Sequence, residues 1–194
     1  MPWTHKSRPS QKRYFNGKHR FEHWYRDNQI YFITARCKDR FPAFTSEAAK
    51  SIFWTKYDQY AAEFEFTPIV TSLLDNHYHS LAYAKRGSEL GEMMRKLHGS
   101  VAKLVNDTLD ERITPFWGDD KGKDYFDGCI RDELQMRRTF RYVYTQCRRH
   151  HVCWDPTEYA HTRVGVELER AVRRATELKA FLYAVPYRRY ERDP

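Results

Sequence analysis

The chain has 194 residues, which suits one folded domain with additions and leaves little room for two full domains. Lys and Arg number 34 against 26 Asp and Glu, and the resulting net charge of +8 favours a polyanionic partner such as nucleic acid. No run of about 18 apolar residues is present and the N-terminus is basic, so neither a membrane span nor a signal peptide is expected. We therefore expect a cytoplasmic protein. Its four cysteines have no CxxC spacing and should be reduced and mostly buried.

The first 28 residues form a basic segment that is rich in aromatic side chains. They contain seven Lys or Arg against two acidic residues, and rings such as those of Tyr14 and Trp24 are interleaved with the charges. Cations of this kind can contact phosphates, and the rings can stack on unpaired bases. The alternative is a solvated tail. We interpret residues 1–28 as a basic aromatic N-terminal arm.

A strand and then a helix are predicted next. Residues 29–37 (QIYFITARC) are rich in β-forming side chains that partly alternate between apolar and polar, which predicts a strand. Residues 46–64 repeat apolar side chains at helical spacing, and Ser46 is a suitable N-cap. This segment is predicted to be a helix that packs on a flat surface.

A hairpin follows, and its second strand carries a pair of histidines. Residues 69–74 and 77–84 are predicted to be two strands joined by a tight turn at residues 75–76. Because side chains alternate across a strand, His77 and His79 project from one face, where two neutral imidazoles can share a metal ion. Such a pair is more often a surface or hydrogen-bonded core feature, and a metal needs a third ligand from another element.

The remaining elements are three helices and one short strand. Helical spacing recurs over residues 88–109, a glycine-containing loop follows, and residues 124–130 (DYFDGCI) predict a short strand. Helical spacing then extends over residues 133–151 and again over residues 165–184, before a basic tail.

The predicted helix at 133–151 carries a second set of polar residues. At about 100° per residue, Tyr142 points well away from the apolar stripe of this helix, so the core does not require it. Tyr142 and Gln146 are four residues apart and share a face, which brings a hydroxyl and an amide oxygen to the same side. A polar face that is merely exposed is the alternative interpretation, because the helix also carries several arginines.

Together these residues resemble the single-tyrosine HUH transposases, which comprise the insertion-sequence-200-like enzymes and the REP-associated tyrosine transposases. The segment LLDNHYHSLAY is similar to the family's apolar strand, Asn-His turn and His-hydrophobic-His motif. The segment PFWGDDKGKDYFDGCIRDELQMRRTFRYVYTQ is similar to its Trp-containing loop, isoleucine-ending strand and tyrosine helix. Order and spacing agree from about residue 20 to 155.

The chain departs from the family pattern at two places. Asp75 stands where many members carry proline, and CRRHHVC replaces an Asn-Pro-Val-Arg-Ala stretch after the tyrosine. Because of the second departure, the resemblance does not specify the residue at which the tyrosine helix ends. The Cys and His residues of CRRHHVC form an alternative zinc site, which is disfavoured because Cys147 already belongs to the apolar stripe.

The resemblance implies a fold and a set of site residues. The fold is an α+β sandwich of the ferredoxin-like kind, with helices on a largely antiparallel sheet and the His pair on a central strand. Residues 29–155 form the HUH catalytic domain in this interpretation, and residues 156–194 a C-terminal helix and basic tail. The site residues that the resemblance implies are Tyr142 as the nucleophile, and His77, His79 and Gln146 as ligands of Mg²⁺ or Mn²⁺. Arg138, Arg141 and Arg149 supply cations for the DNA backbone.

The implied activity is that of a DNA transposase that cleaves and rejoins single-stranded DNA near hairpins through a 5′-phosphotyrosine intermediate. A non-catalytic DNA-hairpin-binding or RNA-binding protein derived from such an enzyme is the alternative. The intact tyrosine, histidines and glutamine disfavour a pure DNA binder. The resemblance allows a mobile or a domesticated gene, Mg²⁺ or Mn²⁺ as the metal, and a Tyr142 that acts in its own subunit or across a homodimer.

Overall fold

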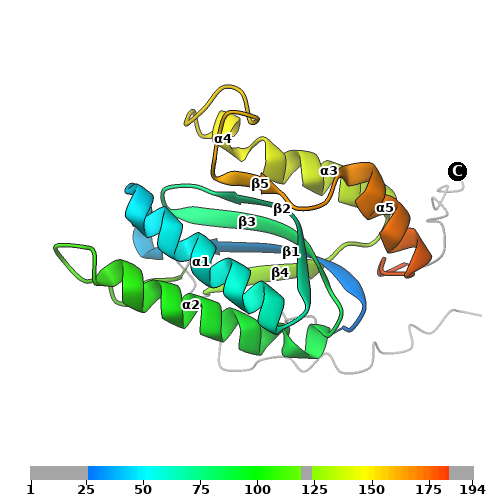
Figure 1. The fold of residues 1–194 in the computed structure, drawn as a ribbon, viewed down its shortest axis with the longest axis horizontal. Helices are drawn as coiled ribbons and strands as arrows, with labels where there is room; N and C mark the ends of the chain where they lie inside the picture. The colour runs from blue at the N-terminus through cyan, green and yellow to red at the C-terminus, as the bar shows by residue number, and fades with distance from the viewer. Residues whose placement is uncertain (1–25, 119–123, 184–194) are drawn as a thin grey trace, which may run out of the picture.

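The elements of the computed structural model, which describes residues 26–118 and 124–183, form a sheet with helices on both faces (Figure 1). The strands are β1 (Gln29–Arg36), β2 (Phe66–Leu73), β3 (His77–Ala84), β4 (Tyr125–Cys129) and β5 (Thr162–Val164). The helices are α1 (Glu47–Glu63), α2 (Leu90–Asn106), α3 (Glu133–Tyr144), α4 (Gln146–Arg149) and α5 (Leu168–Glu177), with short 3-10 turns at Lys38–Arg40 and Gly87–Glu89. The predicted N-terminal arm lies almost entirely outside the described residues.

The sheet confirms the predicted fold class. Its strand order is β4-β1-β3-β2-β5, and every pair of neighbours is antiparallel. The chain order β1-α1-β2-β3-α2-β4 within that sheet is the ferredoxin-like arrangement. As predicted, the strand that carries the His pair is central, with two strands on each side of it.

Side-chain alternation along β3 separates two cores. Tyr78 and Ala82 belong to the core beneath α1 and α2, whereas Leu81 belongs to the core beneath α3 and α5. The two layers of helices are visible on opposite sides of the sheet in Figure 1. Since His77 and His79 share the alternation of Leu81, they project toward the α3 side of the sheet.

The predicted strands, the hairpin and the first helix cap are found in the structure. The Ser46 side chain accepts a hydrogen bond from the Ala49 amide, as expected of an N-cap. The hairpin turn between β2 and β3 is closed by the Leu74 amide, which donates to the His77 carbonyl at 2.8 Å. All four cysteines carry free thiols, and three of them are buried.

The predicted helix at 133–151 is interrupted, which corrects one expectation. Helix α3 ends at Tyr144, and Thr145 (φ −96°, ψ 16°) separates it from α4, which begins at Gln146. The Thr145 hydroxyl donates to the Arg141 carbonyl at 2.8 Å, a side-chain bond of the kind that bends helices. Tyr142 and Gln146 therefore lie on consecutive helices rather than on one.

The C-terminal part of the fold also differs from expectation. Residues 162–164 form an additional edge strand, β5, which pairs with β2 and is too short to show a periodic pattern. Helix α5 spans only Leu168–Glu177 instead of 165–184, because Lys179 adopts a positive φ of 53° and the chain turns there. Within residues 26–118 and 124–183, each helix is too short or too polar to cross a membrane.

Candidate active site

The two histidines of β3 form the centre of the candidate site. Their ring centroids are 5.0 Å apart and their planes are nearly perpendicular, and both side chains are buried on the face of the sheet that α3 covers. Alternation along a regular strand is the cause of this arrangement, as the sequence predicted. Two ligand-type side chains therefore meet on a rigid, central strand.

Hydrogen bonds orient both imidazoles through the same ring atom. His77 Nδ1 lies 2.6 Å from Asn76 Oδ1, and His79 Nδ1 lies 2.7 Å from the hydroxyl oxygen of Thr34 on β1. Within the described residues no hydrogen bond reaches either Nε2 atom. An Nδ1 that is held by a neighbouring oxygen, with Nε2 left available, is the usual arrangement of metal-binding histidines.

The environment keeps both imidazoles neutral. Burial lowers the pKa of His77 to about 4, and the nearby His150 and Arg36 act in the same direction. Burial lowers the pKa of His79 to about 3, with a further contribution from His77. Both rings therefore retain a lone pair near pH 7, which a metal ion requires of its ligands.

Tyr142 lies directly against this pair. Its ring centroid is 5.1 Å from that of His79 and 5.9 Å from that of Phe32, which itself stacks on His79 at 5.7 Å. The guanidinium of Arg149 lies 4.9 Å from the centre of the same tyrosine ring. Tyr142 remains 37% exposed, so a large substrate has access to it. The structure thus brings the predicted nucleophile to the predicted metal ligands.

Gln146 begins the next helix and is buried. Its side-chain nitrogen donates to the Tyr142 carbonyl at 2.8 Å, which leaves the amide oxygen as the end that can bind a metal. His150, the C-cap residue of α4, reaches the histidines, because its ring lies 4.8 Å from that of His77. Helix α4 is therefore positioned beside the His pair even though it does not continue α3.

The donor set fits a divalent ion that prefers oxygen and nitrogen ligands. Across the described residues, no three His, Cys, Asp or Glu side chains are grouped so that they can hold a metal. Among residues 26–118 and 124–183, the Gln146 amide oxygen is a candidate third ligand of another kind. Two neutral imidazoles and an amide oxygen leave further positions for oxygens of water or phosphate, as Mg²⁺ and Mn²⁺ require.

Three residues of the site were not identified from the sequence. Thr34 and Asn76 orient the histidines. The role of Thr34 depends on strand register, for which the sequence carries no signal, whereas Asn76 belongs to the Asn-His turn of the family motif but had no role assigned to it. In the sequence, His150 belongs only to the alternative zinc site, together with Cys147, His151 and Cys153. Its spacing of four residues from Gln146 was the available signal that it shares a helical turn with the proposed ligand.

Of the three arginines predicted to bind DNA, two lie on the tyrosine helix α3 and the third contacts the tyrosine ring. Arg138 and Arg141 are exposed on α3 and make no ion pair within the described residues, and Arg149 lies on the Tyr142 ring. Arg137 differs from them, because it binds both Glu133 and, across to α5, Glu169. It serves to hold two helices together.

An exposed aromatic residue lies beyond α4. Trp154 is 73% exposed, and the Arg148 guanidinium lies 4.6 Å from its ring centre. An exposed ring beside a cation is a suitable surface for an unpaired base, and the sequence did not single it out.

Known transposases are similar to this chain. A family model described as "Transposase IS200 like" matches residues 25–146. A solved structure described as a REP-associated tyrosine transposase bound to a REP hairpin has a similar fold, with a TM-score of 0.64 at 12% identity over 79% of this chain and 87% of that one. Another, described as a putative transposase from Deinococcus radiodurans R1, has a TM-score of 0.42 at 12% identity over 66% of this chain and 97% of that one. No curated protein matches.

Proposed function

This chain belongs to the IS200-like transposase family, because the family model matches more than half of it, and we propose that it cuts and rejoins single-stranded DNA beside hairpins. The observation that carries the proposal is the contact between the Tyr142 ring and His79, at 5.1 Å. A tyrosine that is half-exposed and packed on a neutral, oriented His pair has the surroundings of a nucleophile. A structural tyrosine on α3 needs neither feature.

The proposed reaction transfers a phosphoryl group from a 3′ oxygen of the DNA to the tyrosine oxygen. The Tyr142 oxygen attacks the scissile phosphorus, a bond from phosphorus to the tyrosine oxygen forms, and the bond to the 3′ oxygen breaks. The phenol loses its proton to solvent and the departing 3′ oxygen gains one. Attack by a 3′ hydroxyl on the 5′-phosphotyrosine then reverses these steps, so the strand is rejoined without ATP.

His77, His79 and Gln146 would hold the metal ion. When bound, Mg²⁺ or Mn²⁺ neutralises and orients the scissile phosphate. The protein's own contribution is to keep both imidazoles neutral by burial and to fix their orientation through Thr34 and Asn76. The same packing holds the tyrosine ring beside them.

Two features support single-stranded DNA with hairpins as the substrate. The structure with a TM-score of 0.64 is of a transposase bound to a REP hairpin, and the net charge of +8 suits a polyanion. Arg138, Arg141 and Arg149 would contact the DNA backbone around the nucleophile. The basic aromatic arm at residues 1–28 would add further contacts.

We expect Tyr142 to act in its own subunit, since it packs on the His79 of the same chain. A homodimer is then not required for chemistry.

The experiment that tests this function uses radiolabelled hairpins with single-stranded flanks and Mn²⁺ or Mg²⁺. The wild type should yield cleaved DNA and a protein-DNA adduct that survives denaturing electrophoresis, and EDTA should prevent both. Tyr142→Phe should bind the hairpin but form no adduct. A wild type that binds hairpins without ever cutting them would instead favour the non-catalytic binding protein.

A further inference from the structure

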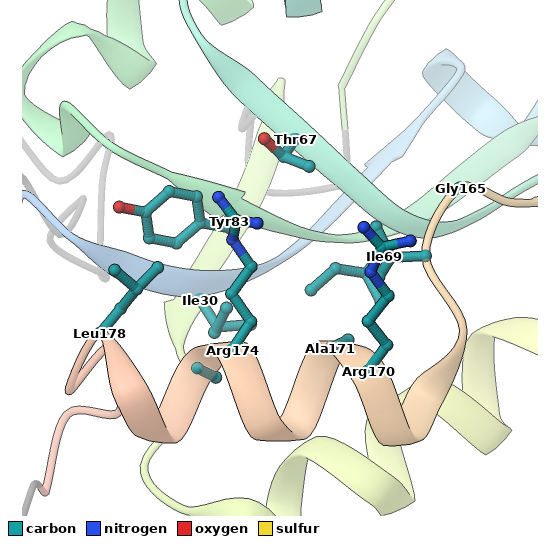
Figure 2. Close-up of a pocket in the computed structure, with 11 residues that line it drawn as sticks. Ile30, Thr67, Ile69, Tyr83, Gly165, Arg170, Ala171, Arg174 and Leu178 are labelled. Atoms are coloured by element: carbon teal, nitrogen blue, oxygen red, sulfur yellow. The ribbon is translucent and has the colours of Figure 1, made fainter.

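A second site lies on the same face of the sheet, between α5 and strands β1 to β3. It is a pocket of about 310 Å³, within the size range of ligand sites. Figure 2 shows α5 along one side and the sheet along the other. Its lining includes Ile30, Ile69, Tyr83, Arg170, Arg174 and Leu178.

The pocket is positively charged. Arg170 and Arg174, one helical turn apart, extend from α5 toward the sheet side of the pocket (Figure 2). Both are exposed, and within the described residues neither forms an ion pair. The described residues that line the pocket include no Asp or Glu. Two uncompensated guanidinium groups on one side of a cavity favour an anion, and phosphate above all.

The other part of the pocket is apolar and aromatic. Tyr83 is half-buried, and its ring is accompanied by Ile30, Ile69 and Leu178. A ring beside aliphatic side chains is a surface on which an unpaired base can stack. The two arginines can bind a phosphate and the ring surface can bind a base. Together they fit a nucleotide better than a simple anion.

Asn28 fixes the two sides of the pocket relative to each other. Its amide nitrogen donates to the Leu178 carbonyl at the end of α5 at 2.7 Å, and its amide oxygen accepts from the Tyr83 hydroxyl at 3.0 Å. The aromatic ring and the C-terminal end of the arginine helix are thus joined through one side chain. Hydrogen bonds within the chain thus hold both sides of the pocket in place, which reduces the entropy cost of binding.

Gly165 fixes the opposite end. Its amide donates to the carbonyl of Ile69, where β2 changes register with β3 between Pro68 and Val70. A Cβ atom at Gly165 would lie only 2.6 Å from the Pro68 carbonyl oxygen, so only glycine allows this approach. The segment leading into α5 is therefore held against β2.

The pocket is aligned with the candidate active site. Tyr83 and His79 project from the same face of β3 and are four residues apart, which corresponds to about 13 Å along a strand. The face between them is covered, because Leu81 is fully buried beneath α3 and α5, so a single strand of DNA would reach both sites by passing over these helices.

We propose that this pocket binds one unpaired nucleotide of the DNA strand on which the active site acts. Arg170 and Arg174 bind its backbone phosphate, and its base stacks on Tyr83. The proposal rests on the proposed function and adds a subsite that holds the strand at a fixed distance from Tyr142.

The first test compares a hairpin that has ten-thymidine flanks with the same hairpin without flanks, by fluorescence anisotropy. The double variant Arg170→Gln/Arg174→Gln should weaken binding of the flanked hairpin only, and should reduce the slope of log affinity against log salt by roughly 0.7 per phosphate released. Tyr83→Leu should weaken it roughly tenfold without changing the slope. Arg173→Gln, on the same helix but outside the pocket, should have no effect on either probe.

The second test uses the wild type and does not depend on how variants fold. Single 5-iodouracil substitutions along the flank should cross-link from one position to peptides that contain Tyr83 or α5. Cross-links only to other segments, or pocket variants that bind the flanked hairpin like the wild type, would overturn the proposal. Preferential cross-linking of oligouridylate would overturn the assignment to DNA.

The two proposals fail separately. The Tyr142 adduct is scored on the same wild-type protein, so an adduct without pocket cross-links removes the subsite and keeps the transposase. Pocket cross-links without an adduct would keep the subsite and remove the catalytic function.

Discussion

The Tyr142 ring lies 5.1 Å from the imidazole of His79, although the two residues belong to α3 and β3, which are far apart in sequence. Phe32 on the neighbouring strand packs against both rings, stacked on His79 and edge-on to Tyr142. The position of the tyrosine is therefore set by packing on the sheet. Three rings from three elements define the geometry from which the predictions below follow.

Removing the hydroxyl of Thr34 should weaken metal-dependent cleavage. This hydroxyl holds His79 Nδ1 at 2.7 Å, and loss of such a partner typically costs about 10- to 100-fold in metal affinity or activity. Thr34→Val should therefore need more Mn²⁺ for half-maximal cleavage, whereas Thr34→Ser should behave like the wild type. A Val variant with an unchanged Mn²⁺ titration would mean that this bond does not orient a ligand.

The arginines of α3 should differ in whether they contribute to DNA binding or to stability. Arg138→Gln and Arg141→Gln should each reduce the salt slope of hairpin binding by roughly 0.7, because each removes a free cation near the nucleophile. Arg137→Gln should leave the slope unchanged and lower the Tm, since Arg137 joins α3 to Glu169 of α5. Equal effects of all three on the slope would contradict this division.

Acidification should destabilise the metal-free protein through its buried histidines. Burial lowers the pKa of His98 to about 3, so between pH 6.5 and 4 the unfolded chain binds a proton there that the folded chain does not. The stabilisation is complete above pH 6.5 and is lost as the pH falls, at about 1.4 kcal/mol per pH unit for each such histidine.

Urea unfolding at pH 7, 6 and 5 measures this effect. His98→Gln should lower the slope of the unfolding free energy against pH by about 1.4 kcal/mol per pH unit, which is the contribution of one such histidine. His151→Gln, an exposed control, should not change it. If the unfolding free energies of the wild type and of His98→Gln changed equally with pH, His98 would not be the source of this contribution.

Mixing two inactive variants tests whether the tyrosine acts in its own subunit. Tyr142→Phe retains the histidines and His79→Ala retains the tyrosine, so a site assembled across a dimer would regain activity in the mixture. Because Tyr142 packs on its own His79, we expect the mixture to remain inactive. Recovered cleavage would show that the tyrosine is exchanged between subunits.

Local patterns were sufficient to predict part of this molecule. The alternation that places His77 and His79 on one face is a property of the strand itself, and the Ser46 cap is a property of one helical turn. The position of Tyr142 off the apolar stripe follows equally from residues close to it in sequence. These features needed no knowledge of how the elements pack.

The rest depends on contacts between distant segments. Thr34 orients His79 only because β1 pairs with β3 in the register that places them opposite each other. The break at Thr145 arises from a side-chain bond that competes with a continuous helical pattern. The pocket beneath α5 requires the β2 register change and the approach of Gly165, and neither feature has a periodic signal.

The most direct test of the central claim is peptide mass spectrometry after incubation of the wild type with a single-stranded hairpin and Mn²⁺. We predict a nucleotide on Tyr142 in the wild type and in Tyr144→Phe, the neighbouring tyrosine variant, and none in Tyr142→Phe. An adduct on another residue, or an adduct that persists in Tyr142→Phe, would contradict the account.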